Sequence, residues 1–336
     1  MQRVLAVLIA AVVLAVIPAF AQKQYKVATT VKLGGDGGWD YLYYDKDAHR
    51  LFITRGTHVM VVDTNTLKVT DDIPDLSGIH GVTLAPELVR GFISNGGDNS
   101  VTIFDLKTLK KLDNVKVGER PDAIMYDPFT KHVFTFNARS KDSTVMDAAS
   151  GKVLGTIPLG GKPEFPATDL KGKVFVNIED KSEIAQIDAN KLTVLNRWPL
   201  GSCQEPSALA FDKERHRLLA GCGNKTMAVV DSESGKVVTS VPICEGVDAG
   251  RFNPNTREVL MSCGEGVLTV IHEDTPDKYT VTQNLATAKG ARTMAMDYEN
   301  NVGYLVTAQR DPKPPAPGQR PAMVPGSFEL IVVKAE

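Results

Sequence analysis

The sequence has 336 residues, of which 43% are hydrophobic and 23% are charged, as in ordinary globular proteins. Its 38 Lys and Arg residues nearly balance its 40 Asp and Glu residues. The chain therefore lacks the broad positive field of a dedicated nucleic-acid-binding protein, and we do not expect nucleic acid as a partner.

The chain begins with the pattern of an export signal. Arg3 precedes an apolar run over residues 4–17, Pro18 ends that run, and a small-x-small motif closes at Ala21. We predict a signal peptide over residues 1–21, cleaved after Ala21, and a periplasmic or secreted mature chain. An uncleaved anchor is the alternative, but the apolar run is short for a membrane span and no second candidate follows.

A repeat of about 42 residues fills the rest of the chain. Its clearest marker is an apolar stretch that ends in Asp and is followed by a polar turn and a second strand. The marker aspartates are spaced by 42, 42, 41 and 43 residues: Asp63, Asp105, Asp147, Asp188 and Asp231. Repeats of this length with several short strands each are typical of a β-propeller, in which one repeat forms one blade.

A second set of positions marks the innermost strand of each blade. The predicted strand ends are Asp45, Ala85, Asp127, Asp169, Asp212, Asn253 and Asp297. Seven residues later an apolar residue lies in the second strand: Phe52, Phe92, Phe134, Val176, Leu219, Leu260 and Tyr304. Residues 22–336 are therefore predicted to form one all-β, seven-bladed propeller with four-stranded antiparallel blades, and we expect a monomer.

The last repeat provides only three strands before the chain ends at Glu336. Residues 25–33, just after the signal, form a spare strand pattern. We predict that this segment supplies the outer strand of the last blade, because pairing the two termini removes open sheet edges.

These repeats resemble the YVTN (YncE-like) family of β-propeller proteins over essentially the whole mature chain. The family tetrad, Tyr-Val-Thr-Asn, corresponds here to residues 52–55, 92–95 and 134–137. Only Asn95 and Asn137 keep the terminal Asn; the other repeats have Arg55, Glu179, Cys222, Cys263 and Thr307. The resemblance implies the propeller fold, whereas related propellers include binding modules, lactonases, lyases and redox subunits.

A ring of polar residues is predicted where the innermost strands begin. It contains Asp40, His80, Asp122, Glu164, Ser207, Asp248 and Arg292, each five residues before a strand end. The tetrad-end residues Arg55, Asn95, Asn137 and Glu179 are expected on the same face. This channel-mouth cluster is the predicted ligand-binding site.

Several chemistries fit such a ring. Oxygen ligands suit Ca²⁺ or Mg²⁺, and the predicted ligands are Asp40, Asp122 and Glu164. A bound cation would polarise a lactone or ester, with His80 or a carboxylate as base. Alternatively, His80 would remove a proton next to a carboxylate that Arg292 holds, as in a lyase.

Trp39 adds an aromatic side chain beside the ring. The catalytic candidates are His80, Asp122 and Arg292, but polar residues are also expected simply as the lining of a water-filled channel. Our leading hypothesis is a binding or scaffold module for a small ligand or an extracytoplasmic protein. A metal-assisted lactonase or other hydrolase, or a lyase, is the alternative.

The four cysteines form two equivalent pairs. Cys203 and Cys222 are 19 residues apart, as are Cys244 and Cys263, and the pairs are offset by one repeat. This spacing favours Cys203–Cys222 and Cys244–Cys263 disulfides, although four cysteines allow three connectivities. A four-cysteine metal site or a redox-active pair is the alternative.

Residues 308–326 form a Pro-rich insertion in the last repeat. It lies between the predicted second and third strands, on the face of the polar ring. A lid, an arm that recognises a partner and a tolerated surface insertion are all compatible with this sequence.

Overall fold

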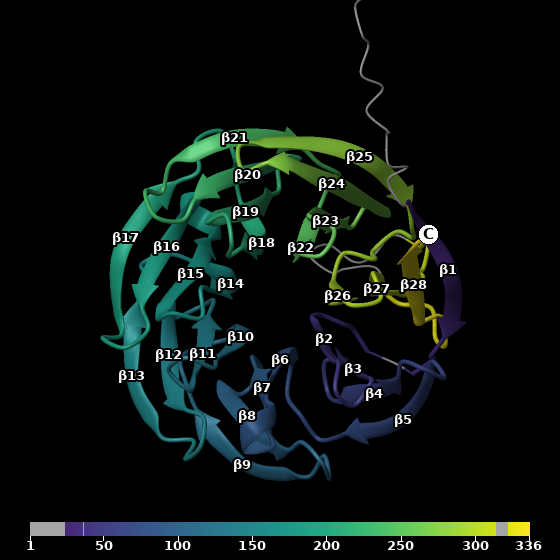
Figure 1. Ribbon diagram of the computed structural model, residues 1–336. Coiled ribbons are helices and arrows are strands. Elements are labelled where there is room, and N and C mark those ends of the chain that lie inside the picture. The colour runs from purple at the N-terminus through teal and green to yellow at the C-terminus, as the bar shows by residue number, and fades with distance from the viewer. Residues whose placement is uncertain (1–23, 36, 314–321) are drawn as a thin grey trace, which may run out of the picture.

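The computed structural model describes residues 24–35, 37–313 and 322–336, and these residues form seven four-stranded antiparallel sheets around one axis (Figure 1). This confirms the predicted all-β, seven-bladed propeller. The predicted signal peptide and the middle of the Pro-rich insertion lie outside the described residues. None of the described helices is long and apolar enough to cross a membrane.

The first four blades use consecutive strands, ordered from the axis outwards. Blade 1 contains β2 (Leu42–Asp45), β3 (Arg50–Thr54), β4 (Val59–Asp63) and β5 (Lys68–Ile73). Blade 2 contains β6 (Ile79–Ala85), β7 (Arg90–Asn95), β8 (Ser100–Asp105) and β9 (Lys111–Lys116). Blade 3 contains β10 (Pro121–Asp127), β11 (His132–Asn137), β12 (Asp142–Asp147) and β13 (Val153–Pro158). Blade 4 contains β14 (Pro163–Thr168), β15 (Lys173–Ile178), β16 (Glu183–Asp188) and β17 (Thr193–Pro199).

The remaining blades include the one that joins the two ends of the chain. Blade 5 contains β18 (Pro206–Asp212), β19 (Arg217–Cys222), β20 (Thr226–Asp231) and β21 (Val237–Pro242). Blade 6 contains β22 (Val247–Asn253), β23 (Glu258–Cys263), β24 (Val267–Thr275) and β25 (Lys278–Ala286). Blade 7 contains β26 (Met294–Asp297), β27 (Val302–Thr307), β28 (Glu329–Ala335) and β1 (Tyr25–Lys32).

The predicted closure of the ring is confirmed by the pairing of β1 with β28. The register runs from Tyr25 opposite Ala335 to Lys32 opposite Glu329. Tyr25 is fully buried and also bonds to blade 6, since its backbone amide donates to the Gln283 side chain at 2.9 Å. The two chain ends therefore share one blade, and its outer strand is connected to the neighbouring blade.

The repeated aspartates owe their periodicity to local turn chemistry. Each ends the third strand of its blade, and its carboxylate accepts a backbone N–H three residues later, as in Thr66 N–H to Asp63 Oδ1 at 2.7 Å. Hydrogen bonds from Thr66 lower the pKa of Asp63 below its usual range. These residues therefore build the turn to the fourth strand. In blade 4 the first strand ends at Thr168, one residue before the predicted Asp169.

The hydrophobic core lies between the blades. The buried apolar residues among those described gather in seven clusters, one at each junction between neighbouring blades, and Tyr41 of blade 1 joins the cluster between blades 3 and 4. The apolar second-strand positions predicted from the repeat all contribute buried side chains, for example Phe52, Phe134 and Leu260. Because each blade buries its sheet faces only against its neighbours, the ring is stable as a closed unit.

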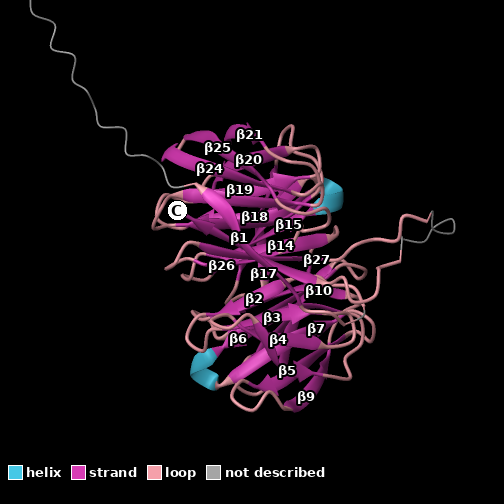
Figure 2. Cartoon of the chain, turned by 90° about the vertical axis from the view of Figure 1, so that its right-hand side faces the viewer, coloured by secondary structure: helices cyan, strands magenta, loops and turns pink. Residues whose placement is uncertain are grey.

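The propeller has two different faces (Figure 2). The turns between first and second strands lie on one face, together with the short 3₁₀ helix η1 (Pro86–Leu88). The other face carries η2 (Glu179–Lys181), the starts of the first strands and the described ends of the Pro-rich insertion. We call this second face the ring face.

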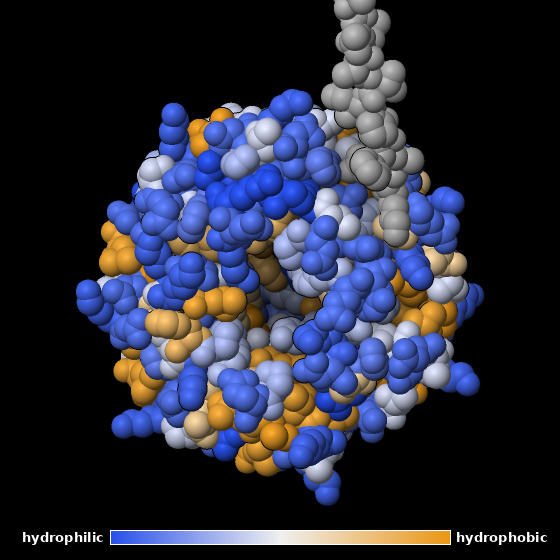
Figure 3. Space-filling model, viewed as in Figure 1, coloured by the Kyte–Doolittle hydropathy of each residue, from blue (hydrophilic) through white to orange (hydrophobic). Residues whose placement is uncertain are grey.

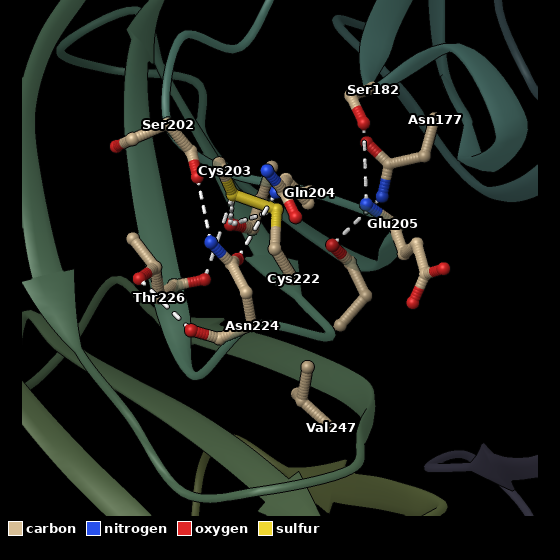
Figure 4. The surroundings of a disulfide bond; sticks show 12 residues. Asn177, Ser182, Ser202, Cys203, Gln204, Glu205, Cys222, Asn224, Thr226 and Val247 are labelled. Carbon is tan, nitrogen blue, oxygen red and sulfur yellow. Dashed lines mark hydrogen bonds between the residues drawn. A yellow bond between two sulfur atoms is a disulfide. The ribbon is translucent and has the colours of Figure 1, made fainter.

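The two predicted disulfides are present. Cys203–Cys222 and Cys244–Cys263 have Cα–Cα distances of 5.7 and 5.8 Å. Each joins the segment before a first strand to the end of the second strand of the same blade. Next to the Cys203–Cys222 disulfide, the Asn224 side chain donates a hydrogen bond to the Ser202 carbonyl at 2.7 Å (Figure 4). This bond also holds the segment before β18. Disulfides of this kind point to an oxidising, extracytoplasmic compartment.

Candidate functional site

The predicted polar ring lies at equivalent positions of the seven blades. His80, Asp122, Glu164, Ser207 and Asp248 are the second residues of β6, β10, β14, β18 and β22, whereas Asp40 and Arg292 come just before β2 and β26. In all five blades of the first group the strand register shifts at this residue, as between Ile79 and Val82. Such bulges redirect side chains, and here each bulge contains a ring residue.

Neighbouring ring residues contact one another in a chain of charges. His80 Nδ1 lies 2.6 Å from Asp40 Oδ2 and 3.6 Å from Asp122 Oδ1. On the other side, Arg292 Nε donates to Asp248 Oδ2 at 2.6 Å, and Arg292 Nη2 lies 3.8 Å from Asp40. The structure therefore brings five of the predicted site residues into one half-buried network.

Lys162 extends the acidic part of this ring. It pairs with Glu164 Oε1 at 2.6 Å and also with Glu179. Both acidic residues were predicted at the site, whereas Lys162 was not. Ser207 makes no contact with these charges among the described residues; its hydroxyl donates to the Val247 carbonyl at 2.7 Å.

Burial makes the charged forms of the ring carboxylates costly. It raises the pKa of Glu164 to about 8 and that of Asp248 to about 6, although Lys162 and Arg292 oppose the two shifts. Burial also raises the pKa of Asp122. For His80, burial opposes the imidazolium, but the hydrogen bond to Asp40 and the nearby carboxylates outweigh it and raise the pKa.

Arg55 and Trp39 lie close to the ring but are used for packing. The fully buried guanidinium of Arg55 lies 3.5 Å from the ring centroid of Phe328. It donates to backbone carbonyls of the segment between β1 and β2: Gly34, Gly35, Gly37 and Gly38. Trp39 is 7% exposed and packs on Phe328, with the Arg292 and Arg310 guanidinium groups over its ring. Arg310 belongs to the base of the Pro-rich insertion.

Asn95 and Asn137 are also turned away from the ring. Both side chains are buried and bond within their own blades: the Asn95 amide donates to Ser100 and Thr102, and the Asn137 amide to Asp142 and Thr144. They connect the second strand to the third. Thr307 donates to the Lys289 carbonyl, and Cys222 and Cys263 form the disulfides.

One part of the ring has the arrangement of a metal site. Single ligand atoms of Asp40, His80 and Asp122 all lie within 4.8 Å of one another. The predicted set was Asp40, Asp122 and Glu164, but the structure places the His80 imidazole with the two aspartates and pairs Glu164 with Lys162. The imidazole packs against Gly96, where a Cβ would lie 2.8 Å from His80 Nε2.

Below the ring, side chains from distant blades meet across the channel. The rings of Tyr41 (blade 1) and Phe165 (blade 4) are 5.3 Å apart, edge to face. The Arg251 guanidinium (blade 6) lies 4.8 Å from the Phe165 centroid. We call these three residues the plug. They separate the polar ring from the rest of the channel.

Beyond the plug lies a well that opens at the face opposite the ring. Its volume is about 730 Å³, within the usual range of small-molecule sites. Its walls are largely apolar and include Met125, Phe211, Met296 and Tyr298, with Lys213 at the mouth. Figure 3 views this face and shows apolar surface inside the central opening.

The polar ring was predicted from the sequence, whereas the plug and the well were not. A usable signal was present, since Tyr41 and Phe165 directly follow ring residues, whereas the same position is occupied by Gly81 and Ala123 in blades 2 and 3. Large side chains at a position that other repeats keep small project into shared space around the axis.

Comparison with known proteins supports the fold but shows no family. No protein-family model matches the sequence, and no curated protein matches it. Many solved chains share the fold, including a chain in a crystal structure of a mitotic checkpoint complex. That chain matches with a TM-score of 0.77 and 12% sequence identity, over 99% of this chain and 98% of its own length. At this identity the likeness shows the fold alone: the protein is a seven-bladed β-propeller, an architecture that commonly serves as a binding or scaffold module.

Proposed function

We propose that this chain is an exported, YncE-like binding propeller that holds a cation, or the cationic group of a small ligand, on its polar ring. The observation that carries this proposal is the excess of acidic over basic groups in the half-buried ring. Among the described residues, the ion-pair partners of Asp40, Asp122, Glu164 and Asp248 within 4.0 Å are Arg292, Lys162 and the titratable His80. A bound cation would offset the cost of ionising these half-buried carboxylates.

A divalent metal ion fits best between Asp40, His80 and Asp122. Their ligand atoms are already grouped, and a mixed set of carboxylates and imidazole suits Mn²⁺ or Zn²⁺ better than Ca²⁺ or Mg²⁺, which prefer oxygen ligands alone. The His80 pKa is raised, so a proton competes with the metal at this nitrogen. We therefore expect tighter metal binding as the pH rises.

Isothermal titration calorimetry of the mature chain with Mn²⁺, Zn²⁺ and Ca²⁺ tests this proposal. We expect one saturable site, and a loss of affinity of about tenfold or more in Asp122→Asn. Asp71→Asn, the same substitution at an exposed site on β5, should bind as the wild type does. Gly96→Ala should also weaken binding, because its Cβ displaces the His80 imidazole. No saturable binding, or equal affinity in Asp122→Asn, would contradict the proposal.

A metal-assisted hydrolase is the second candidate, favoured by the position of His80 within the same cluster. In this case a metal held by Asp40 and Asp122 would polarise a lactone or ester carbonyl, and His80, acting as a base instead of a ligand, would accept a proton from water. Hydrolysis of a lactone and ester panel by the metal-loaded chain, lost in His80→Gln, would support it. The lyase alternative is less well supported, because Arg292 is already paired with the carboxylates of Asp248 and Asp40, which a substrate carboxylate would have to displace or share.

We also propose that a protein partner docks on the ring face. The described ends of the Pro-rich insertion project from this face, and Arg310 contacts Trp39 beside the ring. A partner that docks on the insertion would therefore also lie over the ring. We place the small cationic ligand first, because the ring chemistry gives it a specific set of contacts.

A further inference from the structure

The well on the opposite face is a separate site from the ring. The plug closes its inner end, and turn residues such as Lys213 and Glu214 surround its mouth. Its wall consists of first-strand residues from all seven blades, and most of them are apolar. A well with one closed end, mainly apolar walls and few polar groups has the form of a ligand site.

Arg251 is the exceptional residue at the closed end. Its guanidinium stacks on Phe165, and Nη1 donates to the Gly250 carbonyl at 2.8 Å. Among the described residues no carboxylate lies within 4.0 Å of this guanidinium. Desolvation lowers the pKa of Arg251 from its usual range. A half-buried cation without an anionic partner is costly, and a ligand anion would satisfy it.

The charges at the mouth of the well also favour an anionic ligand. The Lys213 side chain has no ion-pair partner within 4.0 Å among the described residues, and desolvation lowers its pKa. The two acidic residues of the well are directed to Arg257: Asp212 lies 2.9 Å from Arg257 Nη2, and Glu214 lies 3.8 Å from Arg257 Nη1. The positive groups of the well are therefore available to an incoming anion.

We infer that the well binds a small amphipathic organic anion. Its carboxylate would pair with Arg251 at the closed end, where a planar guanidinium offers two parallel hydrogen bonds. Its apolar or aromatic body would pack against Phe165, Phe211 and the flexible Met125, whose side chains are suited to flat and irregular ligand surfaces. Lys213 would attract the anion to the mouth. This inference is independent of cation binding on the ring.

Matched probes test the inference directly. The fluorescence anisotropy of 1-pyrenebutyrate and of its neutral amide, 1-pyrenebutyramide, is measured with the mature chain in EDTA, so that a metal on the ring has no influence. We expect the carboxylate to bind at least about tenfold more tightly than the amide, because only the carboxylate pairs with Arg251.

Three variants connect that difference to Arg251. Arg251→Met keeps the length of the side chain and removes the charge, so both probes should bind equally weakly, whereas Arg251→Lys should restore part of the preference for the carboxylate. Arg139→Met, the same change at an exposed site, should bind as the wild type does. A thermal melt of each variant confirms that it is folded.

Three results would overturn the inference: no binding of 1-pyrenebutyrate, equal binding of the two probes to the wild type, or a carboxylate preference that persists in Arg251→Met. Equal binding would identify the well as a site for neutral apolar molecules. Since EDTA is present throughout, none of these results depends on whether the ring binds a cation.

Discussion

Replacing Glu164 by Gln tests the electrostatics of the ring. Glu164 is 7% exposed, and burial together with the charge of Asp122 raises its pKa from 4.5 to about 8. The folded state therefore holds this proton more tightly than the unfolded state does. Its contribution to stability is fully present below about pH 4.5 and is lost as the pH rises towards 8. The glutamine side chain does not titrate, so the Glu164→Gln variant should lack this part of the pH dependence.

The size of the effect follows from the two pKa values. Each unit between them corresponds to about 1.4 kcal/mol, so the interval from 4.5 to about 8 gives an upper limit of about 5 kcal/mol. The pKa of about 8 already includes the opposing effect of the nearby Lys162. We expect the free energy of unfolding of the wild type to fall by about 2–5 kcal/mol more than that of Glu164→Gln between about pH 5 and pH 9.

Urea denaturation of the mature wild type and variant at several pH values measures this difference. Glu119→Gln, the same substitution at an exposed site on the ring face, serves as control and should follow the wild type. If the wild type and Glu164→Gln lose stability in parallel as the pH rises, Glu164 does not retain its proton in the folded protein. The Glu164 carboxylate would then be ionised at neutral pH, and the ring would carry more negative charge than the raised pKa of Glu164 implies.

Two further predictions concern the stability of the fold. Replacing both Cys203 and Cys222 by Ala should lower the free energy of unfolding by about 3 kcal/mol, the value for a loop of this length, and dithiothreitol should destabilise the variant less than the wild type, because only Cys244–Cys263 remains to be reduced; an unchanged urea midpoint would show that the Cys203–Cys222 bond does not stabilise the fold. Arg55→Met should cost roughly 2–4 kcal/mol, because the backbone carbonyls between β1 and β2 lose the donors of the buried guanidinium, and hydrogen exchange should accelerate in β1 before other strands; uniform exchange throughout the propeller would contradict this role.

Much of the fold could be predicted from the sequence, because the patterns that specify it lie within each repeat. The Asp-containing turns, the apolar second-strand positions and the two equivalent cysteine pairs recur at one period, so each repeat confirms the others. The closing strand was also predictable, since β1 completes a blade that would otherwise have three strands. The start of each first strand was placed well enough to put Asp40, His80 and Asp122 in one ring, although the predicted metal ligands were Asp40, Asp122 and Glu164.

The direction of individual side chains could not be predicted from their positions in the repeat. Asn95 and Arg55 occupy equivalent positions of successive repeats, yet Asn95 bonds to the next strand of its own blade, whereas Arg55 is enclosed by the segment that closes the ring. The outcome depends on the neighbours each side chain meets, and these differ from blade to blade.

The sequence by itself thus determined a closed ring of seven similar blades, its disulfides and the position of an acidic ring. Only the tertiary structure decided that Asp40, His80 and Asp122 converge, that Glu164 pairs with Lys162, and that Tyr41, Phe165 and Arg251 meet across the channel. The physical reason is that local hydrogen bonding and burial repeat along the chain and can be recognised within one repeat. Contacts across the axis join residues more than 80 positions apart, from blades 1, 4 and 6, and no local pattern specifies them.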